Sequence, residues 1–157
     1  GSAASNNDGF TAEPYSGGMA INVGHDGSAA NGDGYVFFRR NGTALGSITQ
    51  VSSTGVAYNT SSDYRLKENV VPMSGATERL KQLKPSRFNF IADPNTTVDG
   101  FLAHEVQDIV PEAISGTKDA VDADGNPEYQ GIDQSKLVPL LVATIQELEA
   151  RITQLES

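Results

Sequence analysis

The chain has 157 residues, 38% of them hydrophobic, and a formal net charge of −9 at pH 7. This length suits one ordinary domain or two small ones, and no apolar run approaches the ~20 residues of a membrane-spanning helix. The negative charge argues against binding nucleic-acid phosphates or an anionic membrane surface, and the absence of cysteine excludes a disulfide framework. We therefore expect no nucleic-acid partner, no membrane association and no cofactor.

The composition changes near residue 62. Residues 1–60 contain 11 of the 16 glycines, whereas residues 63–157 contain 25 of the 31 charged residues. We therefore predict two parts, residues 1–62 and residues 63–157. The expected fold class is α+β, with a β-rich first part and a small mixed α/β second part that ends in a long helix. Gly1-Ser2 is typical of a cloning scar, so we expect a fragment of a longer protein.

The first part alternates short extended segments with turn signals. We predict strands over residues 19–23, 35–39, 45–51 and 56–58, and turns at residues 25–27, 31–34 and 41–42. The strands carry too few large apolar side chains to bury a core, and their edges leave backbone hydrogen-bonding groups unpaired. Intertwining with identical copies satisfies both needs. A small monomeric β-domain or a flexible linker is the alternative. We expect no functional role for His25, which lies in a glycine-rich turn.

The second part mixes helical and strand patterns. Leu80 and Leu83 share one side of a predicted helix over residues 77–84, which Pro85 ends. Residues 87–92 alternate as a strand, and residues 100–106 predict a strand that runs into a short helix ending before Pro111. Further predicted elements are a loop tip at residues 122–127 and a strand near residues 129–132.

The same loop resembles the opening of a calcium-binding loop, with Asp122, Asp124 and Asn126 at alternate positions. The full spacing requires a glutamate at the twelfth position, where this chain has Asp133. We therefore interpret the segment as a hairpin tip and predict no metal site.

The last helix, over about residues 135–156, has the clearest pattern. Ser135 is the expected cap, and Pro139 lies close enough to the first turn to be tolerated. The apolar heptad positions form a short coiled-coil seam for self-association: Val138, Ile145 and Ile152 at a, and Leu141, Leu148 and Leu155 at d. Packing of this face on the chain's own domain is the alternative. Ile at a with Leu at d favours dimers, so the spacing alone does not specify a trimer.

The junction between the two parts holds Ser62 and Lys67, five residues apart. A serine hydroxyl needs a base to become a nucleophile, and a lysine serves as that base only when its pKa is depressed. Arg65 near Lys67 would disfavour a second positive charge, whereas Asp63 would act in the opposite sense if it paired with Lys67. A solvated charged segment is the alternative interpretation.

A family resemblance strengthens the catalytic interpretation. It rests on Ser62-Asp63-Tyr64-Arg65-Leu66-Lys67-Glu68-Asn69-Val70, Gly100-Phe101-Leu102-Ala103-His104-Glu105-Val106, Pro111-Glu112-Ala113 and Ile145-Gln146-Glu147-Leu148. These blocks resemble, in order, the intramolecular chaperone domain of phage tailspikes, tail fibres and endosialidases, which is peptidase family S74. The domain is also similar to the self-cleaving domain of the myelin regulatory factor. Upstream, residues 37–48 resemble the fibre stem that precedes this domain.

The resemblance implies a homotrimeric chaperone. It would align three copies of its own stem, the folding client, into an interwoven structure such as a triple β-helix, and then release itself by autoproteolysis. Ser62 would be the nucleophile and Lys67 the general base, with His104 and Glu105 as assistants; a structural role is the alternative for His104. The stem would lie in the virion tail and the released chaperone in the host cytoplasm. A host-surface receptor would be a partner of regions upstream of this sequence.

The scissile bond has two candidates. The family's usual position is Ser62-Asp63, but attack by Ser62 on its own carbonyl would close a strained four-membered ring. Attack on the carbonyl of Ser61 would close a five-membered ring and cut Ser61-Ser62. We favour Ser62-Asp63 from the resemblance, in which case another group or another chain takes part.

Two other functions compete with a self-cleaving chaperone. One is a trimerisation cap that does not cleave, or a receptor-binding fibre tip. The other is the release domain of a membrane-tethered transcription factor, which predicts a basic DNA-binding region and a membrane span. This acidic, glycine-rich sequence fits a phage fibre better than the release domain of a transcription factor.

Overall fold

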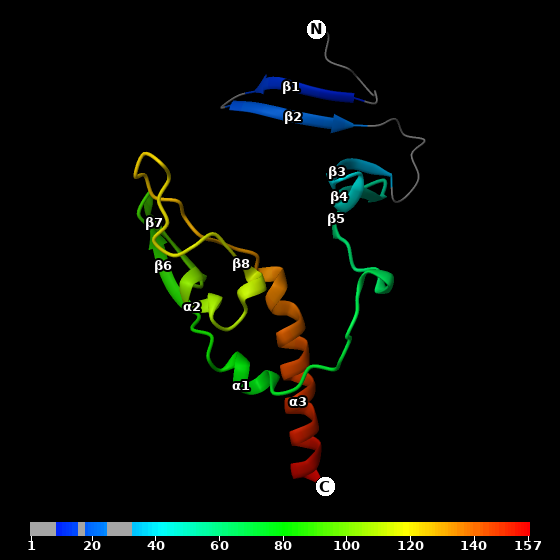
Figure 1. Ribbon diagram of the computed structural model, residues 1–157, viewed down its shortest axis with the longest axis vertical. Coiled ribbons are helices and arrows are strands. Elements are labelled where there is room, and N and C mark those ends of the chain that lie inside the picture. Colours follow the sequence, from blue (N-terminus) through cyan, green and yellow to red (C-terminus); the bar gives the residue numbers. More distant parts are fainter. Residues whose placement is uncertain (1–8, 16–17, 25–32) are drawn as a thin grey trace. The chain divides into compact units, whose positions relative to one another are not determined.

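The computed structural model describes residues 9–15, 18–24 and 33–157. It consists of small antiparallel sheets, short helices and a long C-terminal helix (Figure 1). The chain divides into two compact units, Gly1–Val70 and Val71–Ser157. The boundary predicted at residue 62 from the change in composition therefore falls inside the first unit. The turn expected at residues 25–27 lies outside the described residues, and so do the first two residues of the turn expected at residues 31–34.

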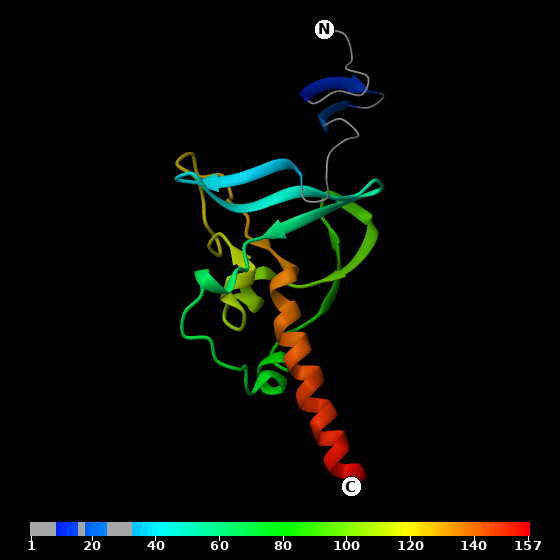
Figure 2. The same ribbon diagram turned by 90° about the vertical axis from the view of Figure 1, so that its right-hand side faces the viewer.

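The first unit contains five strands in two sheets. Strands β1 (Gly9–Tyr15) and β2 (Gly18–Gly24) form an antiparallel pair. Strands β3 (Gly34–Arg40), β4 (Thr43–Ser52) and β5 (Gly55–Thr60) form a three-stranded antiparallel sheet in that order, seen well in Figure 2. The four predicted strands correspond to β2 through β5. The sequence reasoning missed β1, whose residues lack clear apolar alternation.

The Asn41-Gly42 turn joins β3 to β4 as the sequence predicts. Arg40 and Thr43 are paired residues, so the connection has two residues. Asn41 and Gly42 have φ angles of 49° and 82°, the conformation that matches the right-handed twist of a hairpin and that asparagine and glycine adopt most readily.

The three-stranded sheet exposes much of its apolar surface. Among the described residues of the first unit, Thr49 is the one buried side chain. Phe38, Leu45 and Tyr58 are 57%, 53% and 80% exposed. A single chain therefore provides no apolar core for this sheet, and part of the surface remains available to a partner.

The second unit begins with α1 (Ala76–Leu80) and the hairpin of β6 (Ser86–Phe90) and β7 (Asp93–Gly100). The remaining elements are α2 (Ala103–Gln107), the 3-10 turn η2 (Pro111–Ala113), the short pair β8 (Ile114–Ser115) and β9 (Gly131–Ile132), the 3-10 turn η3 (Gln134–Leu137) and α3 (Val138–Glu156).

Several sequence predictions for this unit need correction. Helix α1 ends at Leu80 and does not reach residue 84. Strand β6 ends at Phe90, because residues 91–92 turn the chain into β7, which the sequence reasoning missed. The strand expected over residues 100–102 belongs instead to the end of β7 at Gly100, and the predicted short helix is α2.

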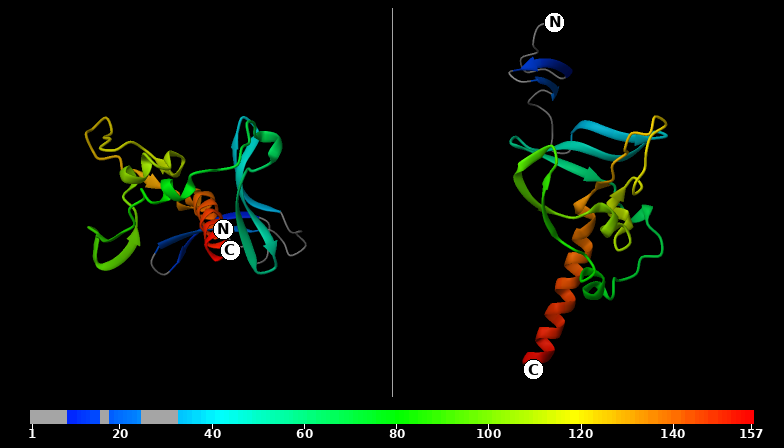
Figure 3. Two further views of the ribbon diagram at one scale, coloured as in Figure 1. Left: turned by 90° about the horizontal axis from the view of Figure 1, so that it is seen from below. Right: turned by 90° about the vertical axis from the view of Figure 1, so that its left-hand side faces the viewer.

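A small apolar core holds the second unit together. Its buried side chains come from α1, α2, η2, η3, α3 and the residue before η2, and they are Ala76, Val106, Val110, Ala113, Leu137 and Leu140. Leu80, Leu83 and Phe101 pack against this cluster from its edge. Short elements far apart in the sequence therefore converge on the first half of α3, as Figure 3 shows from two further directions.

The start of the last helix differs from the prediction. Residues 134–137 form a 3-10 turn, and the side chain of Asp133, not Ser135, caps it by accepting a hydrogen bond from the Ser135 backbone N–H. The α-helix then begins at Val138, with Pro139 in its first turn. Proline is tolerated there because that backbone nitrogen has no acceptor within the helix.

Helix α3 has two different faces. Leu137, at the end of η3, and Leu140 and Thr144 of α3 are buried against the rest of the unit. The six residues predicted to form the seam are exposed to between 41% and 86% of their surface: Val138, Leu141, Ile145, Leu148, Ile152 and Leu155. The final turns of α3 extend beyond the other elements of their unit (Figures 1 and 2).

Glu147 ties α3 to the start of α1. Its carboxylate accepts hydrogen bonds from the backbone N–H groups of Ala76 and Thr77, both at 2.8 Å, and from the Thr77 hydroxyl at 2.6 Å. The Thr77 hydroxyl and backbone, followed by the Ala76 backbone, lower the pKa of Glu147 to about 2. The ionised carboxylate thus satisfies N–H groups that have no acceptor within the short helix.

We expect Glu147→Gln to make the second unit less stable at neutral pH and less sensitive to acid. Because the folded pKa lies below the ordinary value of 4.5, the carboxylate stabilises the fold above pH ~5, and this stabilisation is lost as the pH falls toward 2. Thermal unfolding between pH 7 and pH 2 should show wild type losing more stability than the variant. Glu149→Gln, which removes an exposed carboxylate from the same helix, is the control; parallel pH profiles for wild type and Glu147→Gln would contradict the assignment.

The loop at residues 122–127 closes as a hairpin tip, as predicted. Val121 and Pro127 form an antiparallel bridge. The Asp122 carboxylate accepts hydrogen bonds from the backbone N–H groups of Asp124 and Asn126. It therefore stabilises the turn itself.

Candidate functional site

The three-stranded sheet ends at Ser61, immediately before the predicted site. Ser61 follows the last residue of β5, and its backbone N–H donates a hydrogen bond to the carbonyl of Leu45 in β4 at 3.1 Å. Its hydroxyl donates to the carbonyl of Ala44 at 3.1 Å. Ser61 is therefore anchored to the sheet through both backbone and side chain.

The residues after Ser62 form a 3-10 turn, η1 (Tyr64–Leu66). The backbone N–H of Leu66 donates to the carbonyl of Asp63, and that of Lys67 donates to the carbonyl of Tyr64, both at 3.1 Å. The turn brings residue 67 back toward residue 62. Lys67 Nζ then donates a hydrogen bond to Ser62 Oγ at 2.8 Å, so the two residues expected to react are in direct contact.

Asp63 and Arg65 pair with each other inside this turn. Arg65 Nε and one terminal guanidinium nitrogen donate to the two Asp63 oxygens at 2.9 and 2.7 Å, and the Arg65 backbone N–H donates to the same carboxylate at 2.9 Å. These bonds from Arg65, and to a smaller extent the charge of Lys67, lower the pKa of Asp63. The sequence reasoning considered each residue's effect on Lys67 separately and missed their pairing.

The contact between Ser62 and Lys67 has the geometry for proton transfer. A protonated lysine donates to the serine oxygen, whereas a neutral amine at the same distance accepts the hydroxyl proton and activates the oxygen as a nucleophile. Both residues are exposed in the described chain. The lysine amine and the serine hydroxyl are therefore close enough to react. General-base activity of Lys67 additionally requires surroundings that disfavour its ammonium form.

His104 and Glu105 lie on α2 in the second unit. The Glu105 carboxylate accepts a hydrogen bond from Lys84 Nζ at 3.2 Å, so it is engaged in an ion pair there. His104 is exposed and lies at the edge of a groove. Assistance to Ser62 by either residue stays a prediction.

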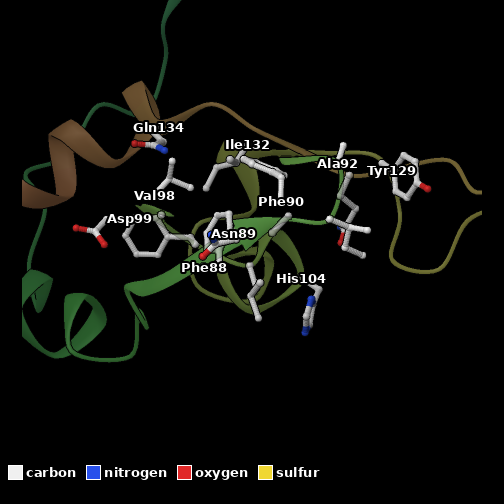
Figure 4. A pocket seen from close by; sticks show the side chains of 16 residues that line it. Phe88, Asn89, Phe90, Ala92, Val98, Asp99, His104, Tyr129, Ile132 and Gln134 are labelled. Carbon is white, nitrogen blue, oxygen red and sulfur yellow. The ribbon is translucent and has the colours of Figure 1, made fainter. Parts of the chain in front are cut away.

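The groove beside His104 is largely apolar and has a volume of about 920 Å³. The hairpin β6–β7 contributes Phe88 and Phe90, whose ring centroids lie 5.4 Å apart in an edge-to-face arrangement. Tyr129 and Ile132 also line the groove (Figure 4). Phe90 and Tyr129 are 61% and 88% exposed. Among the described residues, no group of three or more histidine or acidic side chains could hold a metal.

None of the helices in the described part of the chain is long and apolar enough to cross a membrane. The seam residues of α3 occupy one exposed face.

Comparison with known proteins identifies the segment that contains the site. Residues 62–115 match the family model Peptidase_S74, described as chaperone of endosialidase. The chain is 30% identical over 155 residues to the long tail fiber protein Gp37 of Enterobacteria phage T2, and 32% identical over 100 residues to that of Enterobacteria phage K3. These alignments cover 90% and 61% of this chain, but 11% and 8% of the relatives.

The chain thus spans about a tenth of the length of the phage proteins that it matches. The family match starts at Ser62, and it includes the contact between Ser62 and Lys67, helix α2 and turn η2. Residues 62–115 therefore match the chaperone-of-endosialidase family, and the chain is similar to phage long tail fibre proteins.

Proposed function

We propose that this chain is a self-cleaving intramolecular chaperone of a phage tail fibre or spike. It trimerises, aligns the stem to which it is joined, and is then released by autoproteolysis at Ser62-Asp63. The observation that carries the proposal is the 2.8 Å hydrogen bond between Lys67 Nζ and Ser62 Oγ, which lies at the start of the family match and directly after the end of the sheet. The stem then belongs to the virion tail, and the released domain remains in the host cytoplasm.

The proposed reaction is a serine-dependent peptide cleavage. Neutral Lys67 takes the proton of the Ser62 hydroxyl as Oγ bonds to the carbonyl carbon. The carbon–nitrogen bond breaks, the leaving amine receives the proton from Lys67, and an ester remains on Oγ. Water then hydrolyses the ester, which restores the hydroxyl and leaves a free carboxylate.

The two candidate bonds require different arrangements. For the Ser62-Asp63 bond, the attacking Oγ comes from Ser62 of another chain, because attack within one residue closes a four-membered ring. For the alternative, Ser61-Ser62, Oγ attacks the preceding carbonyl through a five-membered ring in the same chain. In both cases, cleavage separates the anchored Ser61 from the turn that begins at Asp63.

The need for an alignment device follows from the stem. Its three-stranded sheet exposes Phe38, Leu45 and Tyr58, which we propose become covered when three chains intertwine as a triple β-helix. In strands, a slip of one residue moves every inward side chain to the outer face, so glycine-rich strands specify their register weakly. A trimeric chaperone at the end of the stem would align the three chains before they intertwine.

The exposed seam of α3 supports self-association of the chain. Six apolar side chains at a and d spacing are exposed to between 41% and 86% of their surface, which is the pattern of a coiled-coil seam. Assembly would also bring other chains near Lys67, and burial there would disfavour its ammonium form. Cleavage would then follow assembly.

The test is to express the chain, separate it on a denaturing gel and measure the masses of the products. Cleavage at Ser62-Asp63 divides the 157 residues into pieces of 62 and 95, whereas cleavage at Ser61-Ser62 gives 61 and 96. Mass photometry of the undenatured sample should show a trimer. A chain that forms trimers but stays whole would refute autoproteolysis and support the non-cleaving cap or fibre tip; a monomer would refute the chaperone mechanism.

A further inference from the structure

We propose that Arg65 is a positioning residue that sequesters the Asp63 carboxylate and so keeps Lys67 available to Ser62. This inference rests on the proposed Ser62–Lys67 dyad. It concerns the charges that set the pKa of Lys67, the base of the dyad. It starts from the ion pair inside turn η1, where Arg65 contacts both oxygens of Asp63 at 2.9 and 2.7 Å.

The placement of Asp63 creates the need for such control. Asp63 is the residue next to the nucleophile and lies four positions before the base, and its carboxylate senses the charge of Lys67. An unpaired carboxylate four positions before the lysine would attract its ammonium group, raise its pKa and compete with Ser62 Oγ for its hydrogen bonds. Each effect would oppose activation of the serine.

The geometry of Arg65 meets this need. A guanidinium presents two parallel N–H donors that match a carboxylate, and it stays protonated at any pH of interest. Both Asp63 oxygens are engaged by Arg65, and one also accepts the Arg65 backbone N–H at 2.9 Å. The carboxylate is thereby held in the cap of the turn, while Lys67 Nζ is directed to Ser62.

A merely structural ion pair predicts something different. If Arg65 only closed the turn, removing its charge would loosen the segment whether or not Asp63 were charged. Under sequestration, the harm comes from the liberated carboxylate, so neutralising Asp63 as well should repair it. Asparagine is suitable for this purpose because it still caps a helical turn. The other ionisable neighbours of Lys67 on this segment, Tyr64 and Glu68, are the same in all variants.

The decisive experiment measures the titration of Lys67 by NMR in the full chain carrying Ser62→Ala, which prevents cleavage by the proposed nucleophile. Arg65→Gln should raise the Lys67 midpoint by about one pH unit, the lower end of the effect of a nearby opposite charge. Adding Asp63→Asn should bring the midpoint back. An unchanged midpoint in Arg65→Gln, or no return in the double variant, would overturn the proposal.

Cleavage rates provide the second readout. With Ser62 intact, Arg65→Gln should shift the pH profile of cleavage upward by about one unit, which below the midpoint slows the reaction about tenfold. Adding Asp63→Asn should reverse this shift of the pH profile. Equal slowing in both variants without a pH shift would assign Arg65 a purely structural role. If wild type never cleaves, the proposed function fails, while the titration still decides the role of Arg65.

Discussion

Ser62→Ala should leave the chain whole under conditions in which wild type is converted to two pieces. The variant lacks the oxygen that Lys67 Nζ contacts at 2.8 Å, so no ester can form. Lys67→Ala should retain the serine but slow cleavage by about 10²–10⁴-fold, the usual contribution of a general base. Both rates are measured from the intact and cleaved bands on a denaturing gel over time, with the products identified by mass.

Ser61→Ala is the matched control for these variants. It removes a hydroxyl one residue away, whose hydrogen bond goes to the carbonyl of Ala44, and it should cleave at nearly the wild-type rate. All variants should remain trimers by mass photometry, because none alters the seam of α3. Cleavage of Ser62→Ala at the wild-type rate, or its loss only in Ser61→Ala, would assign the nucleophile elsewhere.

Leu148→Asp should dissociate the trimer that we propose. Leu148 occupies a central d position, 41% exposed in the single chain, and the seam would bury it against the same residue of two other chains. Three carboxylates in one apolar layer repel one another, and burying each without a partner costs well over ~2 kcal/mol. Mass photometry at submicromolar concentration should show monomers, and cleavage should slow if assembly precedes it.

Ala150→Asp separates this effect from a general effect of charge on the helix. Ala150 is exposed and lies at position f of the same heptads, opposite the seam. It introduces the same carboxylate two residues away and should leave the trimer intact. Equal dissociation of both variants would indicate a nonspecific effect, and a trimeric Leu148→Asp would place the contact between chains outside the seam.

Local elements with strong short-range signals were predictable from the sequence. The Asn41-Gly42 turn was found because these two residues favour positive φ angles. The long helix was found from its apolar period, but its cap was assigned to Ser135 although Asp133 performs it. Residues 93–100 were missed as a strand because proline, asparagine and aspartate disfavour strands, and pairing with β6 overrides that preference.

At the site, too, the sequence predicted part of the arrangement and the structure provided the rest. The sequence placed Ser62 and Lys67 five residues apart and indicated serine chemistry, whereas turn η1 brings the two polar atoms to 2.8 Å. The partners of Asp63 and Arg65 could not be read from spacing, since either charge can reach Lys67 in an extended chain. The 3-10 conformation and the cap at Asp63 pair them with each other.

By itself, the sequence determined the change in composition near residue 62, most strands of the first unit, the apolar period of α3 and the serine and lysine of the junction. These features depend on neighbouring residues, whose preferences act over a few positions. Only the tertiary structure decided which face of α3 covers the core and which residue secures α1. Those outcomes depend on contacts between side chains that the fold brings together, and helical or strand periodicity alone does not specify such contacts.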